Sequence, residues 1–333
     1  MNLTQSLSSA FGILENKFLN TKRPVALRWN LTYRCNLSCE YCNLSECADK
    51  DNELSTEKIK AVLKEMSNAG VKRISFSGGE PLLREDIGEI IDYTRKVGIT
   101  PTMNSNAILV PEKISELKNL GLLKISLDGT KEVHNMTRGR YEDTIKGLEI
   151  AIENNIKTTL CTTFTKENYG ELDDLVEIAE KYETVIAIQR ATNLYENFSG
   201  AHRILPKKEE IKEKMDEIIN LKKRKPSVIR NSIRHLNLIK NYPKHKKIRC
   251  TAGKLFCIVL PDGTVTPCDR IKVKQDLPSL KENSFDRAFS ELERVNCNGC
   301  CFCGSMELNY LYHLKFDVLR DLINFMMLSK YGD

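Results

Sequence analysis

The sequence predicts an α/β fold, a partial (β/α)6 TIM-like barrel followed by a small cysteine-rich C-terminal extension. The first observation is that short β-branched runs alternate with amphipathic helical stretches from residue 24 to residue 190. Six such units favour a parallel sheet with right-handed crossovers, and six units are too few for a closed eightfold barrel. The second observation is that the twelve cysteines cluster, because four fall between Cys35 and Cys47 and seven follow residue 249.

Each barrel strand is expected as a short apolar run followed by a helix. The strands are predicted at residues 25–31, 73–77, 99–103, 123–127, 157–163 and 185–189. Helices are predicted between them at residues 56–69, 86–97, 111–120, 141–154 and 170–182. Ser55 is a favourable N-cap for the first of these helices, and Gly98 is a favourable end for the second.

The pattern changes after residue 190. Two helices are expected at residues 207–223 and 228–241, on either side of Pro226, and the turn residues Pro261-Asp262-Gly263 indicate a short hairpin. The chain is therefore divided into an N-terminal amphipathic helix at residues 1–22, a barrel core at 23–225 and a cysteine-rich domain at 226–333.

Composition narrows the possible functions. Hydrophobic residues make up 41% and charged residues 29% of the chain, which is too apolar for a disordered protein and too polar for a membrane-spanning one. The net charge of +6 is modest and predicts no nucleic-acid partner. No secretory signal pattern opens the sequence, so we expect a cytoplasmic protein without a disulfide framework. Clustered cysteines in that setting indicate metal or redox chemistry.

Three cysteines follow the first predicted strand as C-x3-C-x2-C, namely Cys35, Cys39 and Cys42. Loops at the C-terminal ends of barrel strands are where such folds place their chemistry. Three thiolates at this spacing can hold one cubic iron–sulfur cluster and leave its fourth iron open to another ligand. A structural zinc site with Cys47 as the fourth ligand is the alternative, although zinc sites usually use C-x2-C pairs.

This motif, with Tyr41 before its last cysteine, resembles the signature of the radical S-adenosylmethionine (radical SAM) superfamily. The segment Ser77-Gly78-Gly79-Glu80-Pro81 after the second strand is similar to that family's glycine-glycine-glutamate motif, which holds the amino group of SAM. Paired glycines let a backbone approach a ligand closely, and Glu80 offers an acceptor for an ammonium group.

Other positions resemble residues that line SAM in this family. Asn104 lies where relatives often have Thr-Asn-Gly, although this chain reads Met103-Asn104-Ser105. Ser126 and Asp128 follow the fourth strand and resemble positions near the ribose and carboxylate of SAM. Arg138 resembles the arginine that pairs with the SAM carboxylate in peptide maturases. An Asp-Gly turn and a surface arginine are the alternatives.

The spacing of Cys250, Gly263 and Cys268 resembles the opening of the SPASM/Twitch extension. That extension carries auxiliary iron–sulfur clusters in radical SAM enzymes such as peptide maturases and the molybdenum-cofactor cyclase. The pair Cys297-x2-Cys300 resembles the next SPASM pair.

After that pair the pattern departs from a full SPASM domain, since Cys301 and Cys303 follow at once. The resemblance implies one auxiliary cluster held by Cys250, Cys268 and two of the later cysteines, and a zinc knuckle is the alternative. The candidate ligands are Cys250, Cys268, Cys297, Cys300 and Cys303. Cys161 and Cys257 are expected to be small buried residues.

The resemblance implies a redox enzyme that uses a [4Fe-4S] cluster and SAM. Reductive cleavage of SAM would yield a 5′-deoxyadenosyl radical that abstracts hydrogen from a substrate C–H bond, while the barrel orients and shields the chemistry. The SPASM-like extension implies a ribosomally made peptide or protein as substrate, with an electron donor such as flavodoxin or ferredoxin. The alternatives are a radical SAM enzyme acting on a lipid or small molecule, and a non-catalytic zinc-binding interaction protein.

Both ends of the chain are apolar on one face. Leu3, Leu7, Phe11, Leu14 and Phe18 recur at helical spacing, and a second apolar stretch covers residues 308–328. Charged residues make both too polar to span a bilayer. We expect helices that pack on the barrel, and an interfacial surface giving peripheral membrane contact is the alternative.

Overall fold

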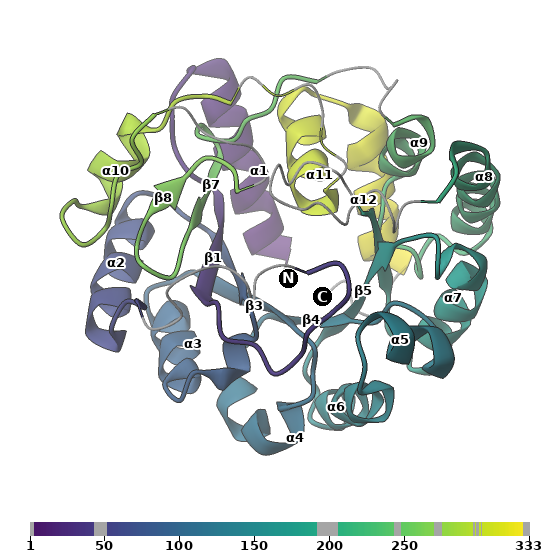
Figure 1. The fold of residues 1–333 in the computed structure, drawn as a ribbon. Helices are drawn as coiled ribbons and strands as arrows, with labels where there is room; N and C mark the ends of the chain where they lie inside the picture. Colours follow the sequence, from purple (N-terminus) through teal and green to yellow (C-terminus); the bar gives the residue numbers. More distant parts are fainter. Residues whose placement is uncertain are drawn as a thin grey trace.

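An eight-stranded sheet forms the centre of the computed structural model, with strand order β6-β5-β4-β3-β2-β1-β7-β8 and helices around its outer face (Figure 1). The structure describes residues 3–42, 52–191, 206–242, 248–269, 275–295, 297, 300 and 302–328.

Six parallel strands form the barrel wall, and each lies within two residues of its predicted range. They are β1 (Ala26–Thr32), β2 (Arg73–Gly78), β3 (Thr100–Ser105), β4 (Leu122–Ser126), β5 (Thr158–Phe164) and β6 (Ile186–Arg190). The register sets Trp29 beside Phe76 and Ser126 beside Cys161. The predicted series of βα units is confirmed.

The helices between these strands also follow the sequence closely. They include α2 (Thr56–Asn68), α3 (Ile87–Lys96), α6 (Tyr141–Glu153) and α7 (Leu172–Lys181), with the 3-10 helices η2 (Pro81–Leu83) and η4 (Tyr169–Glu171). The Ser55 side chain accepts from the backbone of Lys58 and caps α2 as predicted. Gly98 has a φ of +82°, the left-handed conformation that favours glycine.

Two stretches differ from the prediction. The helix expected at 111–120 is a single turn, α4 (Val110–Lys113), continued by the 3-10 helix η3 (Ile114–Leu117). The short helix α5 (Lys131–Thr137) was not predicted.

The C-terminal region extends the same sheet. The predicted hairpin is formed by β7 (Phe256–Val259) and β8 (Val265–Thr266), and β7 pairs in parallel with β1. At the opposite edge, Ile229 forms a parallel bridge with Ile186 of β6. The segments after residue 225 therefore widen the barrel wall at both edges.

The remaining helices surround this sheet. They are α1 (Leu3–Phe18), α8 (Lys208–Arg224), α9 (Ile233–Asn241), α10 (Phe285–Glu291), α11 (Cys303–Tyr312) and α12 (Phe316–Leu328). The helix α9 begins five residues later than predicted, because the Ser232 side chain caps it by accepting from the backbone of His235.

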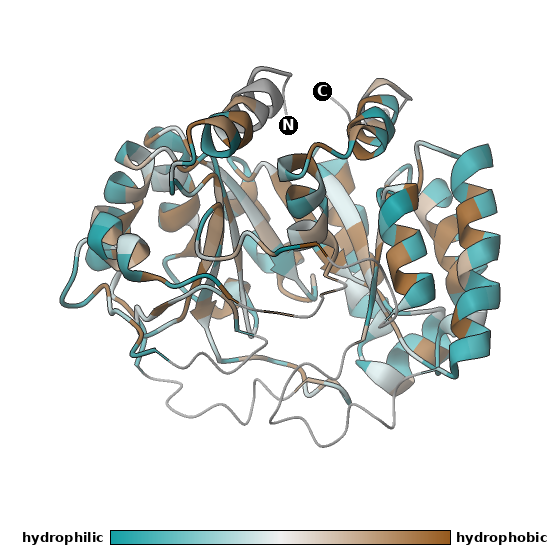
Figure 2. Cartoon of the chain, turned by 90° about the horizontal axis from the view of Figure 1, so that it is seen from above, coloured by the Kyte–Doolittle hydropathy of each residue, from teal (hydrophilic) through white to brown (hydrophobic). Residues whose placement is uncertain are grey.

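The two faces of the sheet differ in chemistry. Trp29, Phe76, Leu123 and Leu160 point to the outer side and are at most 1% exposed, and Figure 2 shows the outer helices with hydrophobic residues toward the sheet. Alternate residues point to the concave side, since successive side chains of a strand face opposite ways. Polar and charged residues occupy that side, including Arg28, Ser75, Asn104, Lys124 and Cys161. The interior of the barrel is therefore polar.

The expectation that the apolar face of α1 packs on the barrel is wrong where the side chains are described. Phe11 is 70% exposed, Phe18 71% and Leu14 40%. The apolar residue Ile13 is buried instead, in a small cluster with Val25, Leu255 and Tyr312. The side chains of Leu3 and Leu7 lie outside the described set.

The last helix, α12, repeats this arrangement. Val318 is fully buried, whereas Phe316, Leu319, Ile323 and Met327 are between 41% and 78% exposed. Figure 2 places α1 and α12 at the same end of the molecule. Within the described residues, no helix is both long enough and apolar enough to cross a membrane.

Candidate active site

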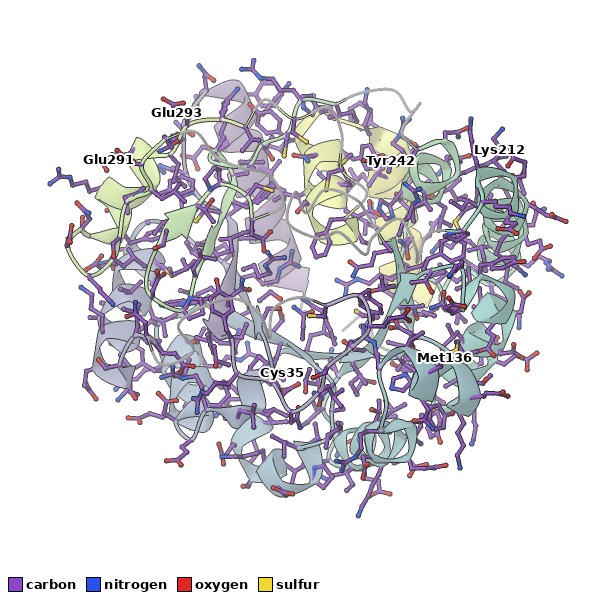
Figure 3. The ribbon with its side chains drawn as sticks, in the orientation of Figure 1. Cys35, Met136, Lys212, Tyr242, Glu291 and Glu293 are labelled. Atoms are coloured by element: carbon purple, nitrogen blue, oxygen red, sulfur yellow. The ribbon has the colours of Figure 1, made fainter. Side chains whose placement is uncertain are left out.

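The three cysteines of the first motif lie on the loop that follows β1, at the C-terminal edge of the barrel. Cys35 and Cys42 are exposed, Cys39 is half-buried, and none of the three forms a disulfide. The loop turns at its end, where the Cys42 backbone N–H donates to the Cys39 carbonyl over 3.0 Å. Figure 3 labels Cys35 on this loop. Cys47 lies outside the described residues.

The glycine-glycine-glutamate segment lies directly against this loop. The Gly79 backbone N–H donates to the Thr32 carbonyl, and the Glu80 N–H donates to the Arg34 carbonyl, both over 2.8 Å. A Cβ atom on Gly78 would lie 2.1 Å from the Thr32 oxygen, and Gly78 has a φ of +121°. The close approach that these glycines permit in this structure is therefore to the cysteine loop. Their approach to a ligand stays a prediction.

Glu80 is 1% exposed and joins the ends of β2 and β3. Its Oε1 accepts from the Ser105 hydroxyl and the Leu82 backbone, and its Oε2 accepts from the Asn106 backbone over 2.8 Å. Burial raises the pKa of Glu80 to about 7 although these three donors favour the charged form. A carboxylate has about four acceptor positions, so one remains for an ammonium group.

Asn106, which the sequence reasoning missed, lies at this edge of the sheet, whereas Asn104 points into the barrel. The Asn106 side chain donates to Asn36 of the cysteine loop over 2.7 Å, and Asn104 donates to Ser75 over 3.3 Å. Ala107 has a φ of +65°, a conformation that favours glycine. The segment Ser105-Asn106-Ala107 thus resembles the Thr-Asn-Gly pattern, and the small residue after Asn106 was the available signal. A contact of Asn104 with SAM stays a prediction.

Asp128, Arg138 and Tyr41 form one connected group. The fully buried Asp128 carboxylate accepts from Arg138 Nε and from the Tyr41 hydroxyl through Oδ2, and from the Thr163 backbone through Oδ1 over 2.8 Å. The Arg138 guanidinium lies 5.2 Å from the centre of the Tyr41 ring. Burial alone would lower the pKa of Arg138, but the neighbouring Asp128 carboxylate raises it above the ordinary value. Asp128 therefore orients the two side chains, and its direct contact with SAM stays a prediction.

Ser126 is the last residue of β4 and is half-buried on the concave side. It lies beside Cys161 in the sheet register. Its contact with SAM is also still a prediction.

The second group of cysteines lines a cavity beside β7. Four cysteines line this cavity, namely Cys250, Cys268, Cys297 and Cys300. Arg28 of β1, Asp269 and Phe302 also belong to its wall. Arg28 and Asp269 form an ion pair at its edge. The Phe302 backbone N–H donates to Cys300 Sγ over 3.3 Å, and the Asn309 amide donates to Cys250 Sγ over 3.6 Å. Burial raises the pKa of Cys250 to about 11.

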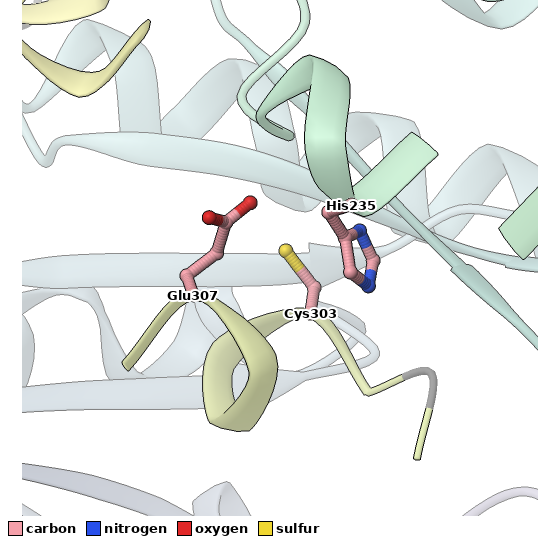
Figure 4. Close-up of side chains that lie close together, drawn as sticks. All are labelled: His235, Cys303 and Glu307. Carbon is pink, nitrogen blue, oxygen red and sulfur yellow. The ribbon is translucent and has the colours of Figure 1, made fainter. Parts of the chain in front are cut away.

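Cys303 belongs to a different cluster from these four cysteines. It begins α11, and its thiol lies near His235 and Glu307, whose ligand atoms are all within 4.8 Å of one another (Figure 4). Cys257 is fully buried in β7, as expected, whereas Cys161 is half-buried on the concave side. Cys301 lies outside the described residues.

Comparison with known proteins gives a family match for part of the chain. The family model for the radical SAM superfamily matches residues 29–179. The Fe-coproporphyrin III synthase of Methanosarcina barkeri (strain Fusaro / DSM 804) is 34% identical over 172 residues, which are 50% of this chain and 43% of that protein. The mycofactocin maturase of Mycobacterium ulcerans (strain Agy99) is 31% identical over 174 residues, covering 50% and 47% of the two chains.

These matches span about half of this chain and less than half of each curated relative. Among solved structures, Streptococcus suis SuiB bound to S-adenosylmethionine has a TM-score of 0.69 at 18% identity and covers 84% of this chain and 68% of its own. SuiB has also been solved with its precursor peptide SuiA. The structural likeness extends beyond residues 29–179 and confirms the predicted fold class.

Proposed function

We propose that this chain, whose residues 29–179 match the family model of the radical SAM superfamily, is a radical SAM enzyme that modifies a ribosomally made peptide or protein. The observation that carries the proposal is the pairing of two loops. The three-cysteine loop and the glycine-glycine-glutamate loop are joined by backbone hydrogen bonds at the C-terminal edge of the barrel. The mycofactocin maturase match and the SuiB–SuiA complex support a peptide as substrate.

The residues at this edge fit a [4Fe-4S] cluster with bound SAM. Cys35, Cys39 and Cys42 provide three thiol ligands from one loop and leave one iron open. Glu80 retains an acceptor position for the SAM ammonium group. Asp128 orients Arg138, whose remaining N–H groups can donate to the SAM carboxylate. When bound, the cluster and SAM supply a 5′-deoxyadenosyl radical that abstracts hydrogen from a substrate C–H bond.

The chain's own residues bind and orient these groups. Asp128 fixes the direction of Arg138 and of the Tyr41 ring, so that a charged donor and an aromatic surface face the site together. Glu80 and Asn106 keep the ends of β2 and β3 and the cysteine loop at a constant spacing. Rigid positioning of this kind is what a site needs to direct a reactive species at one bond.

We propose that the second cavity holds one auxiliary iron–sulfur cluster through Cys250, Cys268, Cys297 and Cys300. Four thiols line this cavity, and the backbone donor at Cys300 suits a cluster-bound sulfur, because hydrogen bonds to sulfur tune cluster potentials. Cys303 is left out of the ligand set, because it faces His235 and Glu307. A small electron-transfer protein such as flavodoxin or ferredoxin is the proposed donor, and the cytoplasm is the proposed location.

The test is anaerobic purification and cluster reconstitution, followed by measurement of 5′-deoxyadenosine formed from SAM with dithionite. We expect a brown protein that cleaves SAM, and a Cys35→Ala/Cys39→Ala/Cys42→Ala variant that does not. Cys161→Ala is the matched control, since this thiol belongs to neither cysteine group. A colourless protein with stoichiometric zinc would instead support the non-catalytic zinc-binding alternative.

A further inference from the structure

Three basic residues lie on the concave side of the barrel, on three separate parts of its wall. Lys124 comes from the middle of β4, Arg73 from the start of β2, and Arg230 from the segment that follows β6. The Arg230 backbone N–H donates to the Ile186 carbonyl over 2.8 Å, which fixes this segment on the sheet edge. All three residues are half-buried.

Polar groups hold Lys124 in place. Its Nζ donates to the Ser75 hydroxyl over 2.7 Å, and Asn104 donates to the same hydroxyl over 3.3 Å. Among the described residues, the charged or titratable groups that act most strongly on Lys124 are Arg73, Arg230, Cys161 and Cys303. These groups are two further cations and two thiols.

The positive charges of this cluster act on one another. Burial, together with Arg73 and Arg230, lowers the pKa of Lys124 to about 7, and burial with Arg230 lowers the pKa of Arg73 to about 10. Neither Lys124 nor Arg230 takes part in an ion pair within the described residues. Like charges gathered in a partly dehydrated site are unfavourable unless an anion joins them.

Among the described residues, the acid Glu307 lies near Arg230, and it is already partly engaged. Glu307 Oε1 accepts from the Ser232 backbone over 2.8 Å, and Glu307 Oε2 has no hydrogen-bond partner. Burial raises the pKa of Glu307 to about 7, so it supplies at most part of one negative charge near neutral pH.

The same acid forms the His235–Cys303–Glu307 cluster, which has the residue types of a metal site. A divalent cation there would be repelled by Arg230 and Lys124, because both lie close enough to Cys303 to act on its thiol. The surrounding charge therefore favours an anion in the barrel over a cation.

We propose that Lys124 and Arg230 bind a carboxylate of the substrate inside the barrel, and that Arg73 adds to the local positive charge. This inference rests on the proposed function, since an unmodified ribosomal peptide carries negative charge only as carboxylates. A guanidinium presents a planar fork that matches a carboxylate, and an ammonium adds a compact second charge. The carboxylate comes from an acidic side chain or from the C-terminus of the peptide, and the substrate class is an acidic peptide.

The experiment measures probe binding by calorimetry at pH 7 on the full reconstituted chain. N-acetyl-glutamate α-amide represents a side-chain carboxylate, N-acetyl-alanine represents a C-terminal one, and N-acetyl-glutamine amide is the neutral control. We expect one or both charged probes to bind, and Lys124→Gln or Arg230→Gln to weaken binding at least tenfold. Lys223→Gln and Arg224→Gln, at exposed positions on α8, are the matched controls and are expected to bind as the wild type does.

Lys124→Arg keeps the positive charge and is expected to retain binding, which separates loss of charge from loss of fold. Equal binding of the neutral probe, no binding of either charged probe, or unchanged binding in both glutamine variants would overturn the inference. The charged probe that binds identifies the source of the carboxylate. SAM cleavage by the wild type reports separately on the proposed function, because the probe assay does not depend on it.

Discussion

The carbonyl oxygen of Arg34 lies 2.1 Å from the point where a Cβ atom on Gly79 would be. Real Cβ atoms do not approach a backbone oxygen so closely, so only glycine fits at this position without movement of the chain. The same carbonyl accepts from the Glu80 backbone over 2.8 Å. The glycine-glycine-glutamate motif is thus part of the support for the cysteine loop as well as a candidate SAM contact.

Gly79→Ala is therefore expected to displace the cysteine loop and reduce iron bound at Cys35, Cys39 and Cys42 by more than half. Gly170→Ala is the matched control, because no atom lies within 4 Å of the added Cβ, and it is expected to leave iron content unchanged. Iron is measured per chain after reconstitution, together with the melting temperature. Full iron loading of Gly79→Ala with normal stability would mean that iron binding does not depend on the close contact between the Gly79 segment and the cysteine loop.

Asp128→Asn should weaken SAM binding roughly tenfold to a hundredfold, because a hydrogen bond to a charged group contributes on the order of 1.5–3 kcal/mol. The amide would no longer hold both Arg138 and Tyr41 through a charged oxygen. Equilibrium dialysis with labelled SAM measures the effect. Asp143→Asn, which removes the solvent-exposed pair with Arg140, is expected to leave the affinity unchanged. Equal affinities in the two variants would assign Asp128 to folding alone.

The two cysteine clusters near the C-terminus should respond differently to substitution. Cys250→Ala/Cys300→Ala removes two thiols from the cavity and is expected to lower iron from about eight to about four atoms per chain. Cys303→Ala is expected to keep about eight, because its thiol faces His235 and Glu307. Loss of iron in Cys303→Ala would return this residue to the auxiliary ligand set.

The strands and most helices of the barrel were predictable because their signals are local. Alternating apolar runs, the Ser55 cap and Gly98 act within a few residues of where they stand in the sequence. The use of Gly79 against Arg34 was not predictable, because that contact joins two loops that only the folded sheet brings together.

The candidate site was predictable in its residue types more than in its positions. Asn104 and Asn106 are two residues apart in the sequence. Only the observed end of β3 at Ser105 shows that Asn104 lies in the strand, whereas Asn106 follows it and contacts the cysteine loop. Cys303 follows Cys300 closely in sequence, but it begins α11, and its thiol faces His235 instead of the cavity. Apolar spacing in α1 predicted that the face with Phe11, Leu14 and Phe18 packs inward, but these side chains are exposed and Ile13, outside that face, is buried instead.

Lys124 should make stability depend on pH in a defined direction. Burial lowers its pKa in the folded protein to about 7 from the ordinary value of 10.5. Between these values the unfolded chain binds a proton that the folded chain does not, so the free energy of unfolding rises as pH rises. Relative to Lys124→Met, the wild type should gain about 2 kcal/mol in the free energy of unfolding between pH 7 and pH 9.

Urea unfolding at pH 7, 8 and 9 measures this difference through Trp29, the single tryptophan, which is 1% exposed in β1. Lys118→Met, at an exposed lysine, is the matched control. A difference between wild type and Lys124→Met that stays constant with pH would mean that Lys124 is fully hydrated.

The exposed face of α1 gives the last prediction. Phe11 and Leu14 are 70% and 40% exposed, so Phe11→Asp/Leu14→Asp should change the free energy of unfolding by no more than about 0.5 kcal/mol per site. Ile13→Asp should cost several kcal/mol, because it places a charge among Val25, Leu255 and Tyr312. Thermal and urea unfolding of both variants measure the contrast, and strong destabilisation by the double variant would restore the packing role that the sequence predicted. Liposome co-sedimentation of the wild type that is lost in the folded double variant would instead identify this face as the one that meets lipid, since an interfacial helix binds through its exposed apolar side chains.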